Sequence, residues 1–299
     1  MVSIMASEKP IDTSTTQYKA QLIAEFIAKH HERVAGRSGP LIVSMQGPQG
    51  AGKSTLAAAL VSFLASAFRL RTAVASLDDF YLDRKGLDEL AQASPNNRML
   101  QGRGPPGTHD IELLRTVLKQ IRGPERNASS VTLPTFDKSL YNGRGDRSES
   151  TIPIHPAELD VFMLEGWSLG FQHVAQPKLH ELWATSQTAH EHDWQTIMQI
   201  NDNLSNLNRE IDSYFDCHVA ITPLDLDYIY YWRLQQEHHM KRENRGLGMS
   251  DDEVRLFVDR YMPCYEVYGS GKVDKDSLRL LYGPEREVVQ VEEDQKISQ

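Results

Sequence analysis

Short, continuous apolar runs alternate along the chain with stretches in which apolar residues recur at helical spacing. Four such runs lie at 40–46, 71–77, 160–167 and 217–222. Runs of this length are too short for helices and are typical of strands buried on both faces of a parallel sheet. The alternation predicts one doubly wound α/β domain, with a mainly parallel sheet flanked by helices.

The remaining periodic segments place helices between and after these strands. Apolar residues three and four positions apart predict helices over 18–34, 56–68, 109–121, 225–244 and 250–261. Either Thr108 or Asp110 is the expected N-cap of the third helix, and Ser250 with Glu253 matches a capping box. Two further strands are expected at 278–282 and 287–291, around a Gly-Pro turn pair.

Two segments lack a clear pattern and were assigned no regular element. Residues 83–106 are mostly polar and turn-rich. Residues 170–213 are polar and His-rich with weak periodicity, which we interpret as an excursion from the core. The expected organisation is a single domain over 17–292, with flexible ends at 1–16 and 293–299.

Charge and composition exclude several classes of partner. The 299-residue chain has a formal net charge of −9, whereas general nucleic-acid binding favours a basic patch or stripe. It has no apolar stretch of about 18 residues and no signal-peptide pattern at its start. We therefore expect a cytoplasmic protein, with the nucleus left open, and no nucleic-acid or membrane partner. Cys217 and Cys264 lack metal-ligand spacing and are expected to be reduced and buried.

The string GPQGAGKSTL, residues 47–56, matches the phosphate-binding pattern G-x-x-x-x-G-K-[ST]. Glycines let backbone N–H groups turn toward phosphate oxygens, and the N-terminus of the following helix adds positive potential. Lys53 is expected to reach the β- and γ-phosphates of ATP, and Ser54 to ligate Mg²⁺. The expected nucleotide-binding residues are Gly47, Pro48, Gln49, Gly50, Ala51, Gly52, Lys53, Ser54 and Thr55.

Carboxylates follow two of the other predicted strands. Asp78 and Asp79 come after the second strand, and Glu165 closes the third. Phosphoryl transfer needs one carboxylate near the attacking hydroxyl and another that supports the metal. We expect Asp78 to act as the base and Ser54, Asp78 and Glu165 to surround Mg²⁺, with the roles of Asp78, Asp79 and Glu165 still interchangeable.

Switch GTPases and motors form the main competing class. A guanine-reading [NT]-K-x-D is absent from the sequence, and the D-x-x-G at 83–86 stands alone in a polar stretch. The sequence therefore favours a small-molecule kinase over a nucleotide-driven switch or motor.

Seven strings in order resemble the plant-type D-glycerate 3-kinases and their fungal ATP-dependent kinase homologues. This family belongs to the wider group of P-loop kinases that includes uridine kinases, phosphoribulokinases and pantothenate kinases. The strings cover residues 47–268 and are GPQGAGKSTL, SLDDFYL, LQGRGPPGTHD, PTFDKSLYNGRGDR, FMLEGWSLGF, WRLQQE and GMSDDEVRLFVDRYMPCYEVY.

The resemblance implies roles for residues outside the phosphate loop. Asp78 matches the base that precedes an aromatic residue, here Phe80, and Glu165 matches the metal-side carboxylate. The helix that carries Arg233, Lys241, Arg242 and Arg245 resembles a lid, with Arg233 as a catalytic candidate, although a solvated basic helix end is the alternative. The implied substrate-side residues are Asp79, Tyr81, Arg103, His109, Asp137, Lys138, Arg144 and Arg147.

Taken together, the sequence predicts a P-loop kinase fold with a helical lid that uses ATP and Mg²⁺. The expected acceptor is a hydroxyl of a small hydroxy acid, with D-glycerate first. The alternatives are a uridine- or pantothenate-type kinase, and a nucleotide-binding regulatory protein without turnover. The sequence makes no prediction of the oligomeric state.

Overall fold

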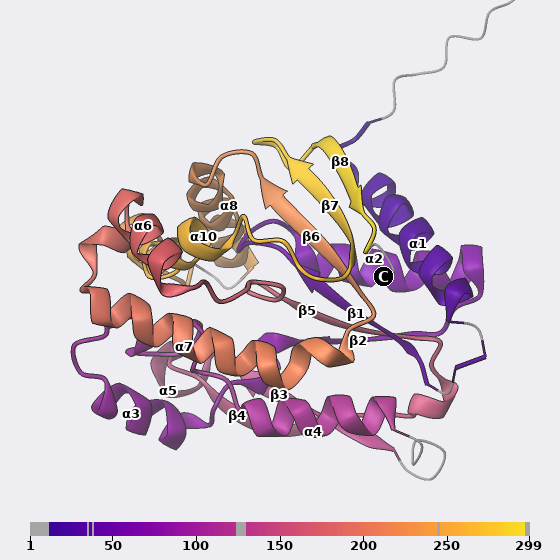
Figure 1. Ribbon diagram of the computed structural model, residues 1–299, viewed down its shortest axis with the longest axis horizontal. Coiled ribbons are helices and arrows are strands. Elements are labelled where there is room, and N and C mark those ends of the chain that lie inside the picture. The colour runs from indigo at the N-terminus through magenta and orange to yellow at the C-terminus, as the bar shows by residue number, and fades with distance from the viewer. Residues whose placement is uncertain (1–11, 35, 38, 124–129, 244–245, 297–299) are drawn as a thin grey trace, which may run out of the picture.

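The four apolar runs form neighbouring parallel strands at the centre of the molecule (Figure 1). The computed structural model describes residues 12–34, 36–37, 39–123, 130–243 and 246–296. Within these ranges, a six-stranded sheet has the order β2-β5-β1-β6-β7-β8, with β8 antiparallel to β7. Its strands are β1 (Leu41–Gln46), β2 (Thr72–Ser76), β5 (Val161–Gly166), β6 (Cys217–Pro223), β7 (Asp276–Tyr282) and β8 (Val288–Asp294). The predicted mainly parallel sheet is confirmed.

Helices cover both faces of this sheet because its central strands are apolar on both sides. Leu41 and Val43 of β1 join one core with α1 and α2, whereas Ile42 and Phe162 join another with α4 and α7. Successive residues of a strand point to opposite faces, so a continuous apolar run supplies both cores. The helices around the sheet are α1 (Thr16–Arg33), α2 (Lys53–Phe63), α4 (Ile111–Arg122), α6 (Gln176–Thr185), α7 (Trp194–Ile211) and α10 (Met262–Tyr268).

A hairpin and a helix that the sequence did not predict stand beside the sheet. β3 (Val131–Asp137) and β4 (Asp146–Ile154) pair antiparallel, and their connection includes the short helical turn α5 (Leu140–Gly143). Most side chains of β4 are exposed, so the strand lacks the apolar run that marks a buried strand. The turn-rich segment contains α3 (Arg84–Ala93), which Asp83 caps by accepting a hydrogen bond from the Gly86 N–H at 2.8 Å.

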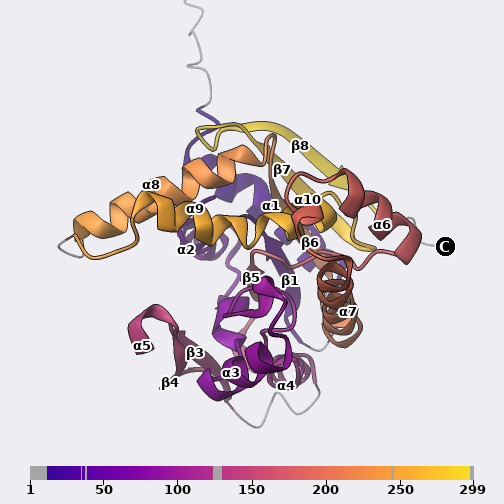
Figure 2. The same cartoon turned by 90° about the vertical axis from the view of Figure 1, so that its left-hand side faces the viewer.

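Two helices project from the sheet on the same side as the hairpin. α8 (Asp227–Glu243) and α9 (Asp251–Asp259) pack against each other, and Figure 2 shows them above the β3–β4 hairpin. The predicted capping box is confirmed, since Ser250 and Glu253 exchange both hydrogen bonds at the start of α9. Residues 244–245 lie outside the described ranges, so the lid candidate Arg245 is not placed.

The interpretation of residues 170–213 as an excursion from the core is wrong. α7 places Ile200, Leu204 and Leu207 in the main apolar core, where they pack with buried residues of α4 such as Leu114. These side chains recur every three to four residues, which is the spacing of an amphipathic helix. The polar residues that obscured the pattern include Asn201 and Asn208, which are themselves buried. Each forms a hydrogen bond with the backbone of the loop before α6.

The ends of the domain differ slightly from the expected bounds. α1 begins at Thr16, capped by Thr15, and β8 continues to Asp294. Residues 1–11 and 297–299, where flexible ends were expected, lie outside the described ranges. No helix in the described part of the chain is long and apolar enough to cross a membrane. Cys217 and Cys264 are both buried and unpaired, as the sequence predicted.

Truncation of α7 tests whether this segment belongs to the core. Leu204→Ala should lower the free energy of unfolding by about 2–5 kcal/mol, because Leu204 is completely buried and its truncation leaves a cavity. The matched control Leu256→Ala, at a side chain with 69% exposure on α9, should cost no more than about 0.5 kcal/mol. Urea unfolding measures both values. If the two variants lost the same free energy of unfolding, residues 170–213 would not belong to the core.

Candidate active site

The phosphate-loop string connects the end of β1 to the start of α2. Gly52 precedes α2 with φ of 85°, and Gly50 has φ of 73°, both in the left-handed region that glycine adopts freely. Lys53 is half-buried, and its Nζ donates a hydrogen bond across the loop to the Pro48 carbonyl at 3.0 Å. Ser54 and Thr55 are exposed in the first turn of α2. The segment is an open loop at a helix N-terminus, which suits a phosphate group.

The loop is held against α8 by a contact that only glycine permits. A Cβ at Gly50 would lie 2.5 Å from the carbonyl carbon of Trp232. Arg286, in the β7–β8 turn, donates to the Gly50 carbonyl at 2.7 Å and to Gln235 Oε1 at 2.8 Å. Its guanidinium also lies 5.4 Å from the centre of the Trp232 ring. Arg286 belongs to none of the motifs, so no local pattern in the sequence indicates this contact.

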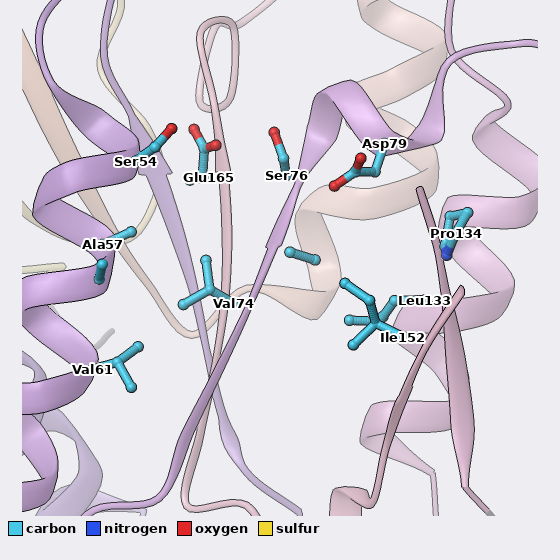
Figure 3. Close-up of a pocket in the computed structure, with 12 residues that line it drawn as sticks. Ser54, Ala57, Val61, Val74, Ser76, Asp79, Leu133, Pro134, Ile152 and Glu165 are labelled. Atoms are coloured by element: carbon cyan, nitrogen blue, oxygen red, sulfur yellow. The ribbon is translucent and has the colours of Figure 1, made fainter. Parts of the chain in front are cut away.

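Oxygen-bearing side chains from the ends of β2 and β5 and from α2 line one cavity of about 470 Å³. Figure 3 shows Ser54, Glu165, Ser76 and Asp79 in a row along one rim, above apolar side chains of α2, β2 and the hairpin. Glu165 pairs in register with Ser76 of β2, which places these two side chains at the same edge of the sheet. Burial raises the pKa of Asp79, which also accepts a hydrogen bond from the Phe136 N–H at 3.1 Å.

Asp78 also follows β2 and lies within a cluster of four predicted site residues, Asp78, Tyr81, His109 and Lys138. One of its oxygens accepts a hydrogen bond from the Tyr81 hydroxyl at 2.8 Å, and the other forms an ion pair with Lys138. The Tyr81 ring stacks on His109 with centroids 4.6 Å apart. His109 is buried, and neither ring nitrogen has a hydrogen-bond partner in the described part of the chain. The cluster therefore joins β2, the hairpin and the loop before α4.

The charges in this cluster set the protonation states. Burial raises the pKa of Asp78, but Lys138, Tyr81 and His109 outweigh it and hold this pKa below the usual value. Burial lowers the pKa of His109 to about 4, so its imidazole is neutral at neutral pH. Burial also lowers the pKa of Lys53, opposed by Glu165 and Asp78. At neutral pH the cluster thus presents an ionised Asp78 beside a neutral imidazole.

Four predicted substrate-side residues are engaged elsewhere. Arg103 donates to the Gly143 and Arg144 carbonyls at 2.8 and 2.6 Å, which ties its loop to the hairpin tip. Arg144 pairs with Asp88 of α3, and Arg147 pairs with Asp110 and also donates to the Tyr81 carbonyl. Asp137 accepts hydrogen bonds from Ser139. These contacts shape the loops around the cluster.

The lid candidate Arg233 lies in the packing between α8 and α9. Its guanidinium pairs with Glu237 at 2.8 Å, with 10% and 4% of the two side chains exposed, and lies over the Phe257 ring. Glu237 Oε1 accepts a hydrogen bond from the Met249 N–H at 2.7 Å, which ties down the turn between the helices. Lys241 and Arg242 lie in the last turn of α8. A role for Arg233 at the phosphates stays a prediction.

The donor atoms fit the expected ATP and Mg²⁺. Carboxylate and hydroxyl oxygens, which Mg²⁺ prefers, come from Ser54, Glu165 and Asp79 along one rim. No group of three His, Cys, Asp or Glu side chains suited to hold a metal alone occurs among the described residues. This fits an ion held mainly by substrate phosphates and one or two carboxylates.

Comparison with known proteins agrees with this geometry. No family model matches the chain. A chloroplastic D-glycerate 3-kinase of Arabidopsis thaliana is 36% identical over 230 residues, which is 77% of this chain and 48% of that protein. The chain therefore spans about half the length of this plant relative. A Saccharomyces cerevisiae protein described as a probable ATP-dependent kinase, TDA10, is 35% identical over 87% of this chain and 88% of its own.

A solved structure supports the same relationship. The D-glycerate 3-kinase from Cryptococcus neoformans superposes with a TM-score of 0.86 at 38% identity and covers 92% of this chain and 99% of its own. The fold and the phosphate loop define a P-loop kinase, a phosphotransferase that uses ATP. The chain belongs to the family of D-glycerate 3-kinases and TDA10-type ATP-dependent kinases.

Removal of the Arg286 guanidinium tests the support of the phosphate loop. Arg286→Met should weaken ATP binding by about tenfold, because it removes the hydrogen bond that holds the Gly50 carbonyl. A hydrogen bond to a charged group contributes about 1.5–3 kcal/mol, and we expect part of this energy to stabilise the binding conformation of the loop. Isothermal titration with ATP measures the change. The control Arg279→Met removes an exposed contact to the Gly271 carbonyl in the same region and should leave ATP binding unchanged. Equal affinities for the two variants would contradict this role.

Proposed function

We propose that the protein transfers the γ-phosphoryl group of ATP to a hydroxyl of D-glycerate, with Mg²⁺ as cofactor. One observation carries this proposal: Asp78 and Lys138 meet at the strand edge that also carries the phosphate loop. A carboxylate beside a cation can receive a hydroxyl proton while the cation binds an acid group of the same acceptor. The relatives described as D-glycerate 3-kinases support this acceptor.

The proposed role of each residue follows from its position in the site. The backbone of 47–52 and Lys53 would bind the phosphates, and Ser54 and Glu165 would hold Mg²⁺, with Asp79 on the same rim. Bound ATP and Mg²⁺ supply the transferable phosphoryl group and neutralise the charge that develops on it. Asp78 would orient the acceptor hydroxyl and accept its proton, because it is ionised at neutral pH. His109 and Tyr81 would form the wall on which a small acceptor rests.

The single domain over 17–292 stays a prediction, and we propose that the small-molecule substrate is a hydroxy acid. The protein's cytoplasmic location and the absence of nucleic-acid partners stay predictions from composition.

A panel assay tests the acceptor. Purified protein with ATP and Mg²⁺ should release ADP in a coupled assay with D-glycerate, and much less with L-glycerate, uridine or pantothenate. Turnover with uridine or pantothenate instead would show that D-glycerate is the wrong acceptor, but it would leave the kinase assignment in place. Stabilisation by ATP without turnover on the whole panel would favour a regulatory protein.

Two substitutions test the assigned roles. Asp78→Asn and Lys53→Ala should each lower kcat by at least about a hundredfold, because they remove proton transfer and phosphate stabilisation respectively. Asp78→Asn should still bind ATP and unfold at the same urea concentration as the unmodified protein.

The matched control is Asp88→Asn, at a carboxylate that pairs with Arg84 and Arg144 away from the phosphate loop. It should retain most of the activity. A near-normal rate for Asp78→Asn in the same assay would remove the base assignment.

A further inference from the structure

The carboxylate proposed as the base is fully engaged by the chain's own side chains. Asp78 receives the Tyr81 hydroxyl on one oxygen and the Lys138 ammonium on the other. The Asp78 side chain is 26% exposed and that of Lys138 is 53% exposed, so solvent and small ligands can reach this ion pair. A hydroxyl that approaches Asp78 therefore meets a carboxylate whose charge already has a partner.

Lys138 is the cation of the substrate-side loops that faces this carboxylate. The guanidinium groups of Arg103, Arg144 and Arg147 are bound to backbone carbonyls, to Asp88 of α3 and to Asp110, the N-cap of α4, respectively. Lys138 has three N–H donors and uses one of them on Asp78 in the described structure. Recognition of an acid group in the acceptor thus falls mainly to Lys138.

The exchange of partners has different costs for charged and neutral acceptors. If an acceptor carries a carboxylate, Lys138 loses one ion pair and gains another, so charge pairing is conserved. A neutral acceptor offers nothing in return, and separation of Lys138 from Asp78 then leaves two charges unpaired in a partly buried site. The ion pair would therefore favour anionic over neutral acceptors, and it would do so at the carboxylate that receives the hydroxyl proton.

We propose that Lys138 exchanges its partner from Asp78 to the carboxylate of a bound hydroxy acid, and so frees the base only for an anionic acceptor. This inference rests on the proposed function and adds how the availability of the base, Asp78, is controlled. In the reaction, the acceptor oxygen forms a bond to the γ-phosphorus, the bond from that phosphorus to the β–γ bridging oxygen breaks, and the hydroxyl proton moves to Asp78. Water brings no anion, so ATP hydrolysis without acceptor stays slow.

Two acceptors that differ in charge test this exchange: D-glycerate and its neutral amide, D-glyceramide. Lys138→Met should lower kcat/KM for D-glycerate by about a hundredfold and raise it several-fold for D-glyceramide, because Asp78 is no longer paired. The rate of ATP hydrolysis without acceptor should also rise. Lys138→Arg should restore part of the preference for D-glycerate, since it keeps the charge.

The matched control is Lys178→Met, which removes an exposed lysine paired with Glu181 on α6 and should change neither rate. Thermal unfolding with ADP, Mg²⁺ and D-glycerate gives a second readout: D-glycerate should stabilise the unmodified protein but not Lys138→Met. ADP alone should stabilise both, which shows that the variant is folded.

The outcomes separate the two proposals. If the unmodified protein does not phosphorylate D-glycerate, both the proposed function and this exchange are wrong. If it does, but Lys138→Met loses both acceptors equally or keeps the same preference, the exchange alone is overturned.

Discussion

The alignment of three strand ends is the constraint on which the site depends. Within the described ranges β1, β5 and β2 are parallel neighbours, and Glu165 pairs in register with Met45 on one side and Ser76 on the other. Because the carboxyl ends of parallel strands meet at one edge, the phosphate loop, Glu165 and Asp78 leave the sheet side by side. The two apolar cores behind this edge fix it in place.

Two pieces face this edge, the β3–β4 hairpin and the α8–α9 pair. The hairpin that carries Lys138 is mostly exposed along β4, and it contacts the strand ends through the Phe136 N–H and Lys138 itself. Above the hairpin in Figure 2, α8 and α9 hold Arg233 between them. If the hairpin contacts the acceptor as proposed, the phosphate-binding edge and the acceptor contacts lie on separate elements, and one kinase frame can serve different acceptors.

Patterns in the sequence could predict what depends on burial or on a fixed backbone requirement. The central strands and the phosphate loop follow from apolar runs and glycine spacing, and the comparisons confirm the family. The sequence contains enough information to predict α7, since its apolar residues recur at regular helical spacing. The buried asparagines at 201 and 208 interrupt this apolar pattern and obscure it. The hairpin had no comparable signal because its second strand is exposed. Pairings such as Arg144 with Asp88 or Arg286 with Gly50 depend on tertiary structure, which no local pattern encodes.

The β7–β8 turn has a consequence for the way the chain is built. Arg286 contacts Gly50 across 236 positions of sequence, so the last strands of the sheet complete a loop near its beginning. During synthesis the nucleotide loop would emerge early but lack this support until the final strand pair has formed. A protein shortened before this turn would keep the glycines of the nucleotide loop but lack the Arg286 hydrogen bond to the Gly50 carbonyl.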